Sequence, residues 1–224
     1  MTIKILPLIG RLCFLILIPL VSLIHIYSNR FRPGVHDIKT FADQIIPFNK
    51  YFAVPYQFMV IFITLVLIYL AIVDYKYYFG LLASVIIGMF ICFIIFFFYP
   101  TTVPRPIIQG NDFFTKMVLN IYSGDNPYNC FPSIHVLSAY LPMLFVFKYN
   151  KSFLMKGFTL IGCVSITLST MFIKQHYILD ALASIIMGTL LFLVFSNKSI
   201  WERRPFKAAI DFLIPFKLRN DIHS

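Results

Sequence analysis

Charged residues are scarce in this chain of 224 residues. Lys, Arg, Asp and Glu make up only 12% of it and hydrophobic residues 59%, whereas about a quarter of a soluble domain is charged. This composition excludes an ordinary water-soluble domain and indicates an integral membrane protein. Acidic residues are rarest, nine against 19 Lys and Arg, which gives a net charge of +10. In so apolar a chain, membrane topology and anionic lipid explain the basic excess better than nucleic acid, so no nucleic-acid partner is expected.

Cysteine is also sparse. Its four positions show no paired spacing, and three of them lie in hydrophobic runs: Cys13, Cys92, Cys130 and Cys163. This pattern argues against a disulfide scaffold or a zinc site and favours small buried hydrophobes. The chain has no cluster of Asp and Glu with metal-ligand spacing, so neither a metal nor another cofactor is expected. No small-residue cleavage site follows the first hydrophobic run, which is therefore expected to be retained.

Long hydrophobic runs, by contrast, are abundant. Each is close to the roughly 20 residues needed to cross about 30 Å of hydrocarbon. They predict an all-α fold, a polytopic bundle of six transmembrane helices that forms a single membrane domain over residues 1–224. The predicted spans lie near residues 10–27, 55–74, 78–99, 134–149, 154–173 and 177–196.

Six spans would place both chain ends on the same side of the membrane. That side carries 12 of the 19 Lys and Arg, and the opposite side carries seven. The positive-inside rule then predicts a multi-pass protein of the cell membrane with both termini in the cytoplasm. The tail, residues 197–224, is expected to form a basic cytoplasmic segment at the membrane surface, with Trp201 at the headgroup level.

The two longer loops, residues 28–54 and 100–133, would then face outward. Both carry hydrophobic residues at helical spacing, which predicts short amphipathic helices that lie on the membrane or pack over the bundle. In the first loop these residues are Ile38, Phe41, Ile45 and Phe48. In the second they are Phe113, Phe114, Met117, Val118 and Ile121.

Three polar islands interrupt the hydrophobic pattern. They are "YPTTVPRPII" with Arg105, "NCFPSIHVLSAY" with Ser133 and His135, and "FIKQHYILDAL" with Lys174, His176 and Asp180. His135 and His176 are 41 residues apart, which corresponds to roughly 60 Å of helix or two membrane crossings. Both histidines would therefore lie at the outer boundary of the membrane, beside the loop that carries Arg105. The sequence predicts one site there.

Each island suggests a role at a phosphate site. Ser133 suits the N-cap of the fourth span, whose free N–H groups would attract an anion, and His135 would project beside it. Asp180 lies four residues after His176, so its carboxylate would fix the imidazole tautomer and leave the other nitrogen as a nucleophile. Arg105 and Lys174 would supply positive charge.

Simpler interpretations exist for each residue taken singly. A lone histidine at a membrane interface is usually an amphipathic side chain, and His25, His36 and His223 are interpreted in this way. The pair of His176 and Asp180 alone is as consistent with a structural ion pair. The ordered set of three islands on one membrane face is what favours a functional site.

In this order the motifs resemble the type 2 phosphatidic acid phosphatase superfamily of integral membrane lipid phosphatases. The pattern of that superfamily is KxxxxxxRP, then PSxH, then SRxxxxxHxxxD, and residues 105–106, 132–135 and 169–180 match it within a similar core of about 55–196. Phe98 stands where the first motif has Lys, and Thr170 where the third has Arg. Lys174, one helical turn later, is the candidate replacement. The branch that resembles inositol phosphorylceramide and sphingomyelin synthases shows a similar thinning of basic residues.

The resemblance implies a metal-independent phosphatase acting on a lipid phosphate at the outer leaflet, with phosphatidic acid, phosphatidylglycerol phosphate or a polyprenyl pyrophosphate as candidate substrates. His176, oriented by Asp180, would attack phosphorus, and His135 would protonate the departing oxygen. The implied phosphate ligands are Arg105, Ser133 and Lys174. Two alternatives remain: a lipid phosphotransferase like the synthases, and a non-enzymatic protein that binds or moves lipid phosphate. The expected partners are the substrate and membrane lipids.

Overall fold

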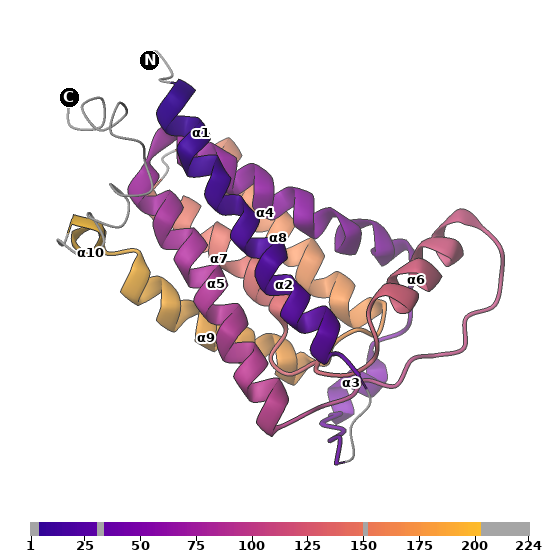
Figure 1. The fold of residues 1–224 in the computed structure, drawn as a ribbon. Coiled ribbons are helices and arrows are strands. Elements are labelled where there is room, and N and C mark those ends of the chain that lie inside the picture. The colour runs from indigo at the N-terminus through magenta and orange to yellow at the C-terminus, as the bar shows by residue number, and fades with distance from the viewer. Residues whose placement is uncertain (1–4, 31–33, 150–151, 203–224) are drawn as a thin grey trace.

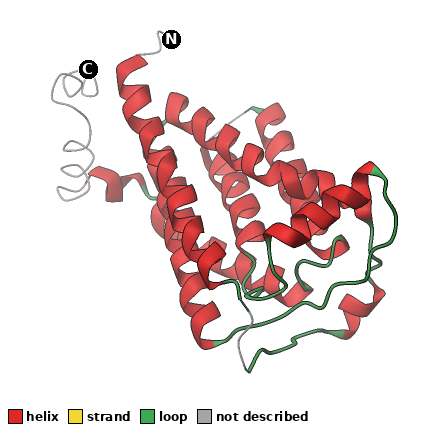
Figure 2. Cartoon of the chain, turned by 45° about the vertical axis from the view of Figure 1, so that its right-hand side comes forward, coloured by secondary structure: helices red, strands yellow, loops and turns green. Residues whose placement is uncertain are grey.

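The computed structural model describes residues 5–30, 34–149 and 152–202. Throughout these ranges the regular elements are helices, and the only β pairing is two isolated bridges between loop residues. Figure 2 shows the helices side by side, with the long loops gathered toward one end of the bundle. The predicted all-α membrane bundle is confirmed.

The N-terminal helical run consists of α1 (Ile5–Cys13), the 3-10 turn η1 (Phe14–Ile16) and α2 (Leu17–Ser28). The two long loops, residues 29–52 and 99–133, are called the first and second outer segments. The first holds α3 (Phe41–Ile45) and η2 (Lys50–Phe52), and it is followed by α4 (Ala53–Val73) and α5 (Tyr75–Phe98). The second outer segment holds α6 (Phe113–Gly124). The remaining helices are α7 (Ile134–Tyr149), α8 (Phe153–Phe172), α9 (Ile178–Phe195) and α10 (Lys198–Glu202).

Five helical segments of the described chain are long and apolar enough to cross a membrane: Leu8–Ser28, Lys50–Val73, Tyr75–Phe98, Phe153–Phe172 and Ile178–Phe195. The six predicted spans exceed this number by one. The remaining predicted span is α7, whose 16 residues are about 24 Å long. It packs against α4, α5, α8 and α9, so protein rather than lipid surrounds much of it, and its length need not match the membrane.

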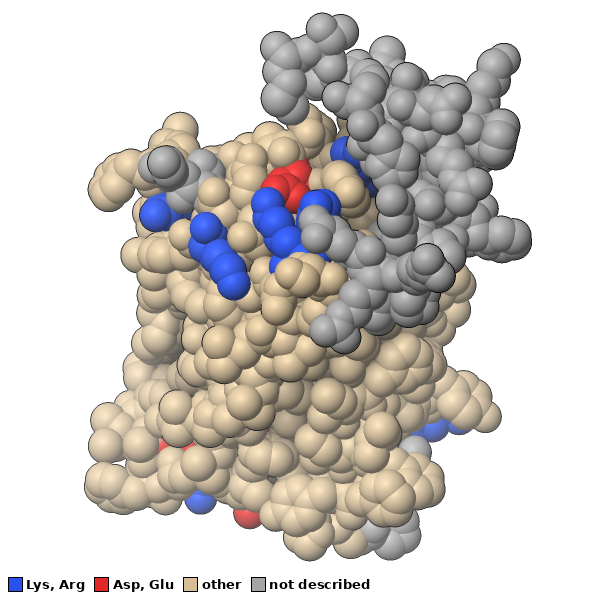
Figure 3. Space-filling view, turned by 90° about the vertical axis from the view of Figure 1, so that its left-hand side faces the viewer, with Lys and Arg blue, Asp and Glu red and all other residues tan. Residues whose placement is uncertain are grey.

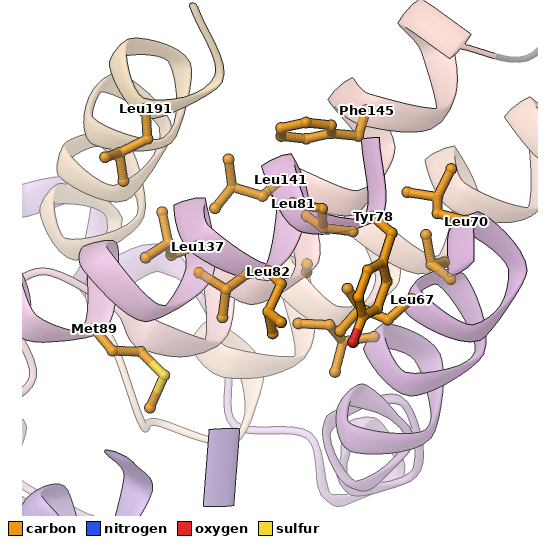
Figure 4. Close-up of a cluster of buried hydrophobic side chains, with 14 of the residues drawn as sticks. Leu67, Leu70, Tyr78, Leu81, Leu82, Met89, Leu137, Leu141, Phe145 and Leu191 are labelled. Carbon is orange, nitrogen blue, oxygen red and sulfur yellow. The ribbon is translucent and has the colours of Figure 1, made fainter. Parts of the chain in front are cut away.

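Helix α7 supplies much of the core. Its fully buried Leu137, Leu141 and Phe145 pack with Leu81 of α5 and Leu191 of α9 in one hydrophobic cluster, as Figure 4 shows. Lipid tails are as apolar as these side chains, so close packing rather than the hydrophobic effect must hold the helices together within the membrane.

Glycines allow the closest helix contacts. A Cβ added to Gly80 of α5 would lie 2.6 Å from the backbone oxygen of Phe195 in α9 and 2.8 Å from the ring of Phe145 in α7. By contrast, a Cβ added to Gly157 of α8 would meet nothing within 4 Å. The contact at Gly80 involves backbone, which cannot move aside as a flexible side chain can.

We therefore expect Gly80→Ala to lower the free energy of unfolding by about 1–3 kcal/mol, the usual cost of overpacking. Gly157→Ala gains the same helix propensity without a clash, so it is the matched control and should be neutral or slightly stabilising. Thermal unfolding of both variants in detergent measures the difference. Equal midpoints for the two variants would contradict the predicted contact.

One end of the bundle is marked by charge. Figure 3 shows basic side chains gathered at that end around acidic ones, with a broad uncharged band below them. There Asp74 accepts hydrogen bonds from the backbone of Lys76 and Tyr77 at the start of α5 and pairs with Lys198. Figure 1 places α1 and α10 at this end and α3 and α6 near the other.

The predicted basic tail is described only through α10. Trp201 is buried against the bundle, since its ring lies against Phe79 and Phe195 and its indole nitrogen donates to the Phe195 carbonyl at 3.1 Å. Residues 203–224 of the predicted tail lie outside the described residues.

The outer segments form short helices at the opposite end. Helix α6 buries Val118 and Ile121 and exposes Phe113, as an amphipathic helix should. Helix α3 has only five residues, because Thr40 and Asp43 cap its start and the chain turns extended at Ile46. Of the four apolar residues predicted to face the same way in this loop, Phe41 and Ile45 are exposed. Ile38 and Phe48 pack inward.

Candidate functional site

A cavity of about 140 Å³ lies at the end of the bundle where the outer segments cover the helices. Its walls come from α2, α4, α5, α7, the chain after α6 and the turn between α8 and α9. Its polar wall includes His25, Asp125, Asn129, His135, Gln175 and His176. Across residues 5–30, 34–149 and 152–202, no group of three His, Cys, Asp or Glu side chains is placed to hold a metal ion.

Two histidines face each other in this cavity. Nδ1 of His135 lies 3.2 Å from Nε2 of His176, and Nδ1 of His176 lies 3.2 Å from Oδ2 of Asp180. An ionised carboxylate only accepts hydrogen bonds, so Nδ1 of His176 carries a proton and Nε2 of the neutral ring keeps its lone pair. The structure therefore brings together the three residues that the sequence nominated as catalytic, with the lone pair of His176 directed toward His135.

A tight turn after α8 sets the position of His176. The carbonyl of Thr170 accepts hydrogen bonds from the backbone N–H of Gln175 at 2.8 Å and of His176 at 3.1 Å. Lys174 takes a left-handed conformation, with φ of 53°, to complete the turn. The backbone of Thr170 thus fixes the position of His176, and the hydroxyl of Thr170 donates a hydrogen bond to the carbonyl of Thr167.

Arg105 reaches the histidine cavity through Gln175. Its guanidinium donates to Oε1 of Gln175 at 2.8 Å and to the carbonyl of Tyr122 at 2.9 Å, and it lies over the Tyr122 ring at 4.3 Å. Burial lowers the pKa of Arg105, although the nearby carboxylate of Asp125 opposes this, and the group remains a cation. Nε of Arg105 and Nε2 of Gln175 are buried without a protein partner, so both residues keep a hydrogen-bond donor that an anion could use.

Ser133 is buried and joins α7 to α9. Its hydroxyl accepts from the N–H of Val136, which caps α7, and its own N–H donates to the carbonyl of Asp180 at 3.3 Å. The hydroxyl of Ser184 lies 2.8 Å from the carbonyls of both Ser133 and Asp180. Ser133 therefore occupies the predicted N-cap, but its own polar groups are already engaged within the protein.

The structure does not bring Lys174 to the histidines. Its ammonium donates to the carbonyl of Ile46, and it lines a second cavity of about 410 Å³ together with Lys39 and Arg105. Burial and the neighbouring Lys39 lower the pKa of Lys174, against the effect of Asp43. Phe98, at the position of the missing motif lysine, is 78% exposed at the end of α5. Arg105 lines this second cavity as well, and its hydrogen bond to Gln175 links it to the wall of the histidine cavity.

Besides Gln175, three residues near His135 were not assigned to the site from the sequence. Tyr56 of α4 contacts His135, and Asp125, just after α6, contacts both Tyr56 and His25. The interpretation of His25 as a lone interface side chain is wrong, since Asp125 lies 3.3 Å from it. A carboxylate ten residues before His135, in a chain with nine acidic residues, was the available signal.

Of the other two histidines given that interpretation, the structure describes His36 only. His36 stacks on Tyr99 with the ring centroids 4.4 Å apart, and it does not line the histidine cavity. His223 lies outside the described residues. A single histidine in the sequence therefore gave no indication of whether it would meet a carboxylate.

Fold and site together define a multi-pass helical membrane protein with two histidines and a carboxylate meeting at one end of the bundle. The family model described as PAP2 superfamily matches residues 36–194, more than half of the chain. The chain belongs to this superfamily, the type 2 phosphatidic acid phosphatases, and membership supports a phosphatase-type function on lipid phosphates. No curated protein and no solved structure gives a significant match.

The two basic candidates should differ in phosphate binding. Orthophosphate should raise the thermal unfolding midpoint of the protein in detergent, because a ligand of the native state stabilises it by mass action. Arg105→Gln should lower the affinity for orthophosphate at least about tenfold, since it removes the cation that is hydrogen-bonded to Gln175 of the cavity wall. Lys174→Gln should lower the midpoint without ligand but keep the phosphate-induced shift. Loss of the shift in Lys174→Gln alone would contradict this assignment.

Proposed function

We propose that this protein is a metal-independent lipid phosphate phosphatase that hydrolyses a phosphomonoester or pyrophosphate lipid at the outer leaflet. The supporting observation is the contact of 3.2 Å between Nδ1 of His135 and Nε2 of His176. Asp180 contacts the other ring nitrogen of His176. Phosphatidic acid, phosphatidylglycerol phosphate and polyprenyl pyrophosphate are the candidate substrates.

In the first step, the two rings move apart and the substrate phosphate takes the place of the hydrogen bond between them. Nε2 of His176 forms a bond to phosphorus as the bond to the leaving oxygen breaks, and that oxygen takes the electron pair together with the proton from Nδ1 of His135. The two nitrogens that face each other in the structure are thus the two that act. Asp180 stabilises the positive charge that develops on the His176 ring.

In the second step, water attacks the phosphohistidine. Nδ1 of His135, now unprotonated, takes a proton from that water as the bond between phosphorus and Nε2 of His176 breaks. Inorganic phosphate leaves and both histidines return to their starting forms. Arg105, with Gln175 beside it, stabilises the charge that grows on the phosphate oxygens in both steps.

An apolar groove beside the site favours a lipid substrate over a soluble phosphate. It measures about 530 Å³ and lies between α5 and α9, with Ile91, Ile95, Leu190 and Val194 among its lining residues. It ends at Phe131 and Pro132, which adjoin Cys130 of the histidine cavity in the chain. An acyl or prenyl chain in this groove would hold its phosphate near the histidines.

The orientation in the membrane is part of the proposal. The site lies at the end of the bundle opposite the cluster of basic side chains around Asp74. By the positive-inside rule that cluster faces the cytoplasm, which puts both termini there and the histidine cavity at the outer leaflet.

The test is release of phosphate from radiolabelled lipid phosphates by purified protein in liposomes. His176→Ala should abolish turnover, and His135→Ala should reduce it at least about 100-fold, the usual contribution of general acid–base catalysis. His36→Gln is the matched control and should keep full activity, because His36 stacks on Tyr99 outside the histidine cavity. Full activity of His176→Ala would overturn the mechanism.

A lipid phosphotransferase on the same site is the second candidate. It is favoured by the cavity wall, where the described lining residues include no Lys or Arg and the side-chain oxygens of Asn29 and Asn129 nearby have no protein donor. Such a wall suits a neutral acceptor with hydroxyl groups. Adding alcohols to the same assay distinguishes the two, since transfer would move the label into a new lipid. Binding without any turnover in the parent protein would instead indicate a non-enzymatic lipid-phosphate protein.

A further inference from the structure

The hydrogen bonds at His135 continue beyond the two histidines. Oη of Tyr56 lies 2.7 Å from Nε2 of His135, and the two rings stack with centroids 4.6 Å apart. The same hydroxyl lies 3.5 Å from Oδ2 of Asp125. On its other oxygen, Asp125 is 3.3 Å from Nε2 of His25 and accepts a hydrogen bond from Asn29. His135 therefore has a carboxylate partner at one remove, through the phenol of Tyr56.

Asp125 is an ionised carboxylate in this arrangement. Burial opposes its ionisation, but the hydrogen bond from His25 and the nearby imidazoles of His135 and His25 outweigh burial and hold the pKa of Asp125 below its usual value. An ionised carboxylate only accepts, whereas Tyr56 has a single hydroxyl proton. Tyr56 can therefore donate either to Asp125 or to His135, but not to both at once.

This limit links the proton of Tyr56 to the charge of His135. If His135 is neutral with its proton on Nδ1, Tyr56 donates to Nε2 and Asp125 loses that hydrogen bond. If His135 carries both protons, Nε2–H donates to the Tyr56 oxygen and Tyr56 donates to Asp125, so each bond of the series has one donor and one acceptor. The series is complete only when His135 is the cation that a general acid requires.

We propose that Tyr56 and Asp125 are positioning residues that keep a proton on Nε2 of His135 and thereby make Nδ1 its working nitrogen, with His25 and Asn29 fixing Asp125. The inference rests on the proposed phosphatase mechanism. When Nδ1 gives its proton to the leaving oxygen, His135 keeps the proton on Nε2 and has a lone pair on Nδ1. That is the form that then accepts a proton from water.

The two histidines are thus supported alike from opposite sides. Asp180 holds the nitrogen of His176 that faces away from the gap, and Asp125 does the same for His135 through Tyr56. The titratable groups around His135 come from α2, α4, the outer loops, the turn before α9 and α9 itself. They are His25, Tyr56, Arg105, Asp125, His176 and Asp180. Asp180 is engaged by His176, and Arg105 by Gln175 and Tyr122, so Asp125 is the carboxylate positioned to act on His135.

The first test varies the leaving group. Tyr56→Phe keeps the stacked ring and removes only the hydroxyl. An alkyl lipid phosphate needs a proton on its leaving oxygen, whereas a nitrophenyl phosphate ester with an alkyl chain on the ring leaves readily without one. For the alkyl substrate kcat/KM, which covers the steps up to the first cleavage, should fall about 10- to 100-fold, and for the aryl substrate less than about threefold. Asp125→Asn should show the same selectivity.

Two further measurements separate positioning from a merely structural role. The double variant should lose little more than the worse single variant, because both residues act in one series. The alkaline limb of the kcat/KM profile should move to lower pH in Tyr56→Phe, since His135 must be protonated in the first step and has lost the acceptor that favours its cation. Tyr51→Phe, at an exposed tyrosine of η2, is the matched control and should change neither quantity.

Equal losses on alkyl and aryl substrates, or an unmoved alkaline limb, would overturn the inference while leaving the phosphatase mechanism intact. A readout without turnover separates the two proposals. In ¹⁵N-histidine spectra recorded with orthophosphate, the ring of His135 should lose its second proton at lower pH in Tyr56→Phe than in the parent. If the parent hydrolyses neither ester, the proposed function fails, but the titration of His135 still tests this inference. Loss of the second proton at lower pH in Tyr56→Phe supports the series of hydrogen bonds, and loss at the same pH as in the parent overturns it.

Discussion

Asp180 joins the helix that carries His135 to the turn that carries His176, and the rest of the site depends on it. Its carboxylate accepts from the His176 ring at 3.2 Å, and its carbonyl accepts from the backbone N–H of Ser133 at 3.3 Å. Ser133 caps α7, and His135 lies in the first turn of that helix. One fully buried acidic residue at the membrane boundary therefore sets the position of both rings. Its Oδ2 accepts hydrogen bonds from the His176 ring and from the N–H of Tyr177, whereas its Oδ1 has no protein partner, and the two hydrogen bonds offset part of the cost of burying a carboxylate.

The charge distribution around this centre is unlike the superfamily pattern that the sequence suggests. Two expected basic positions are occupied by Phe98 and Thr170, and Lys174 is directed to the carbonyls of the first outer segment. Arg105 remains, half-buried over Tyr122 and joined to the cavity wall by its hydrogen bond to Gln175. In the proposed mechanism, the imidazolium forms of the two histidines would add to the charge of Arg105, and Asp180 and Asp125 would favour those forms.

The position of the site also follows from how the bundle is built. Helix α7 has only 16 residues and packs against α4, α5, α8 and α9. Its first turn therefore faces protein rather than lipid. The outer segments close over that turn, while the groove between α5 and α9 stays apolar. A cavity with a polar wall and an apolar groove thus lie close together at this end of the bundle.

Much of this protein follows from the sequence by itself. Long apolar runs determine a helical membrane bundle, because backbone polar groups in lipid must be satisfied within the segment. Helix periodicity and the spacing of two crossings bring His135 to His176, and the four-residue spacing of His176 and Asp180 sets their contact. These are local rules, and they need no knowledge of which helices are neighbours.

Only the tertiary structure decided the remainder. Tyr56 and His25 lie on helices whose faces look uniformly apolar, and Asp125 follows a surface helix, so no periodicity relates them to His135. Lys174 looked suited to phosphate, but the left-handed turn at this residue directs its ammonium to Ile46. The physical reason is the same in each case: side-chain direction and helix neighbours depend on packing across the whole bundle, which a pattern along one segment does not contain.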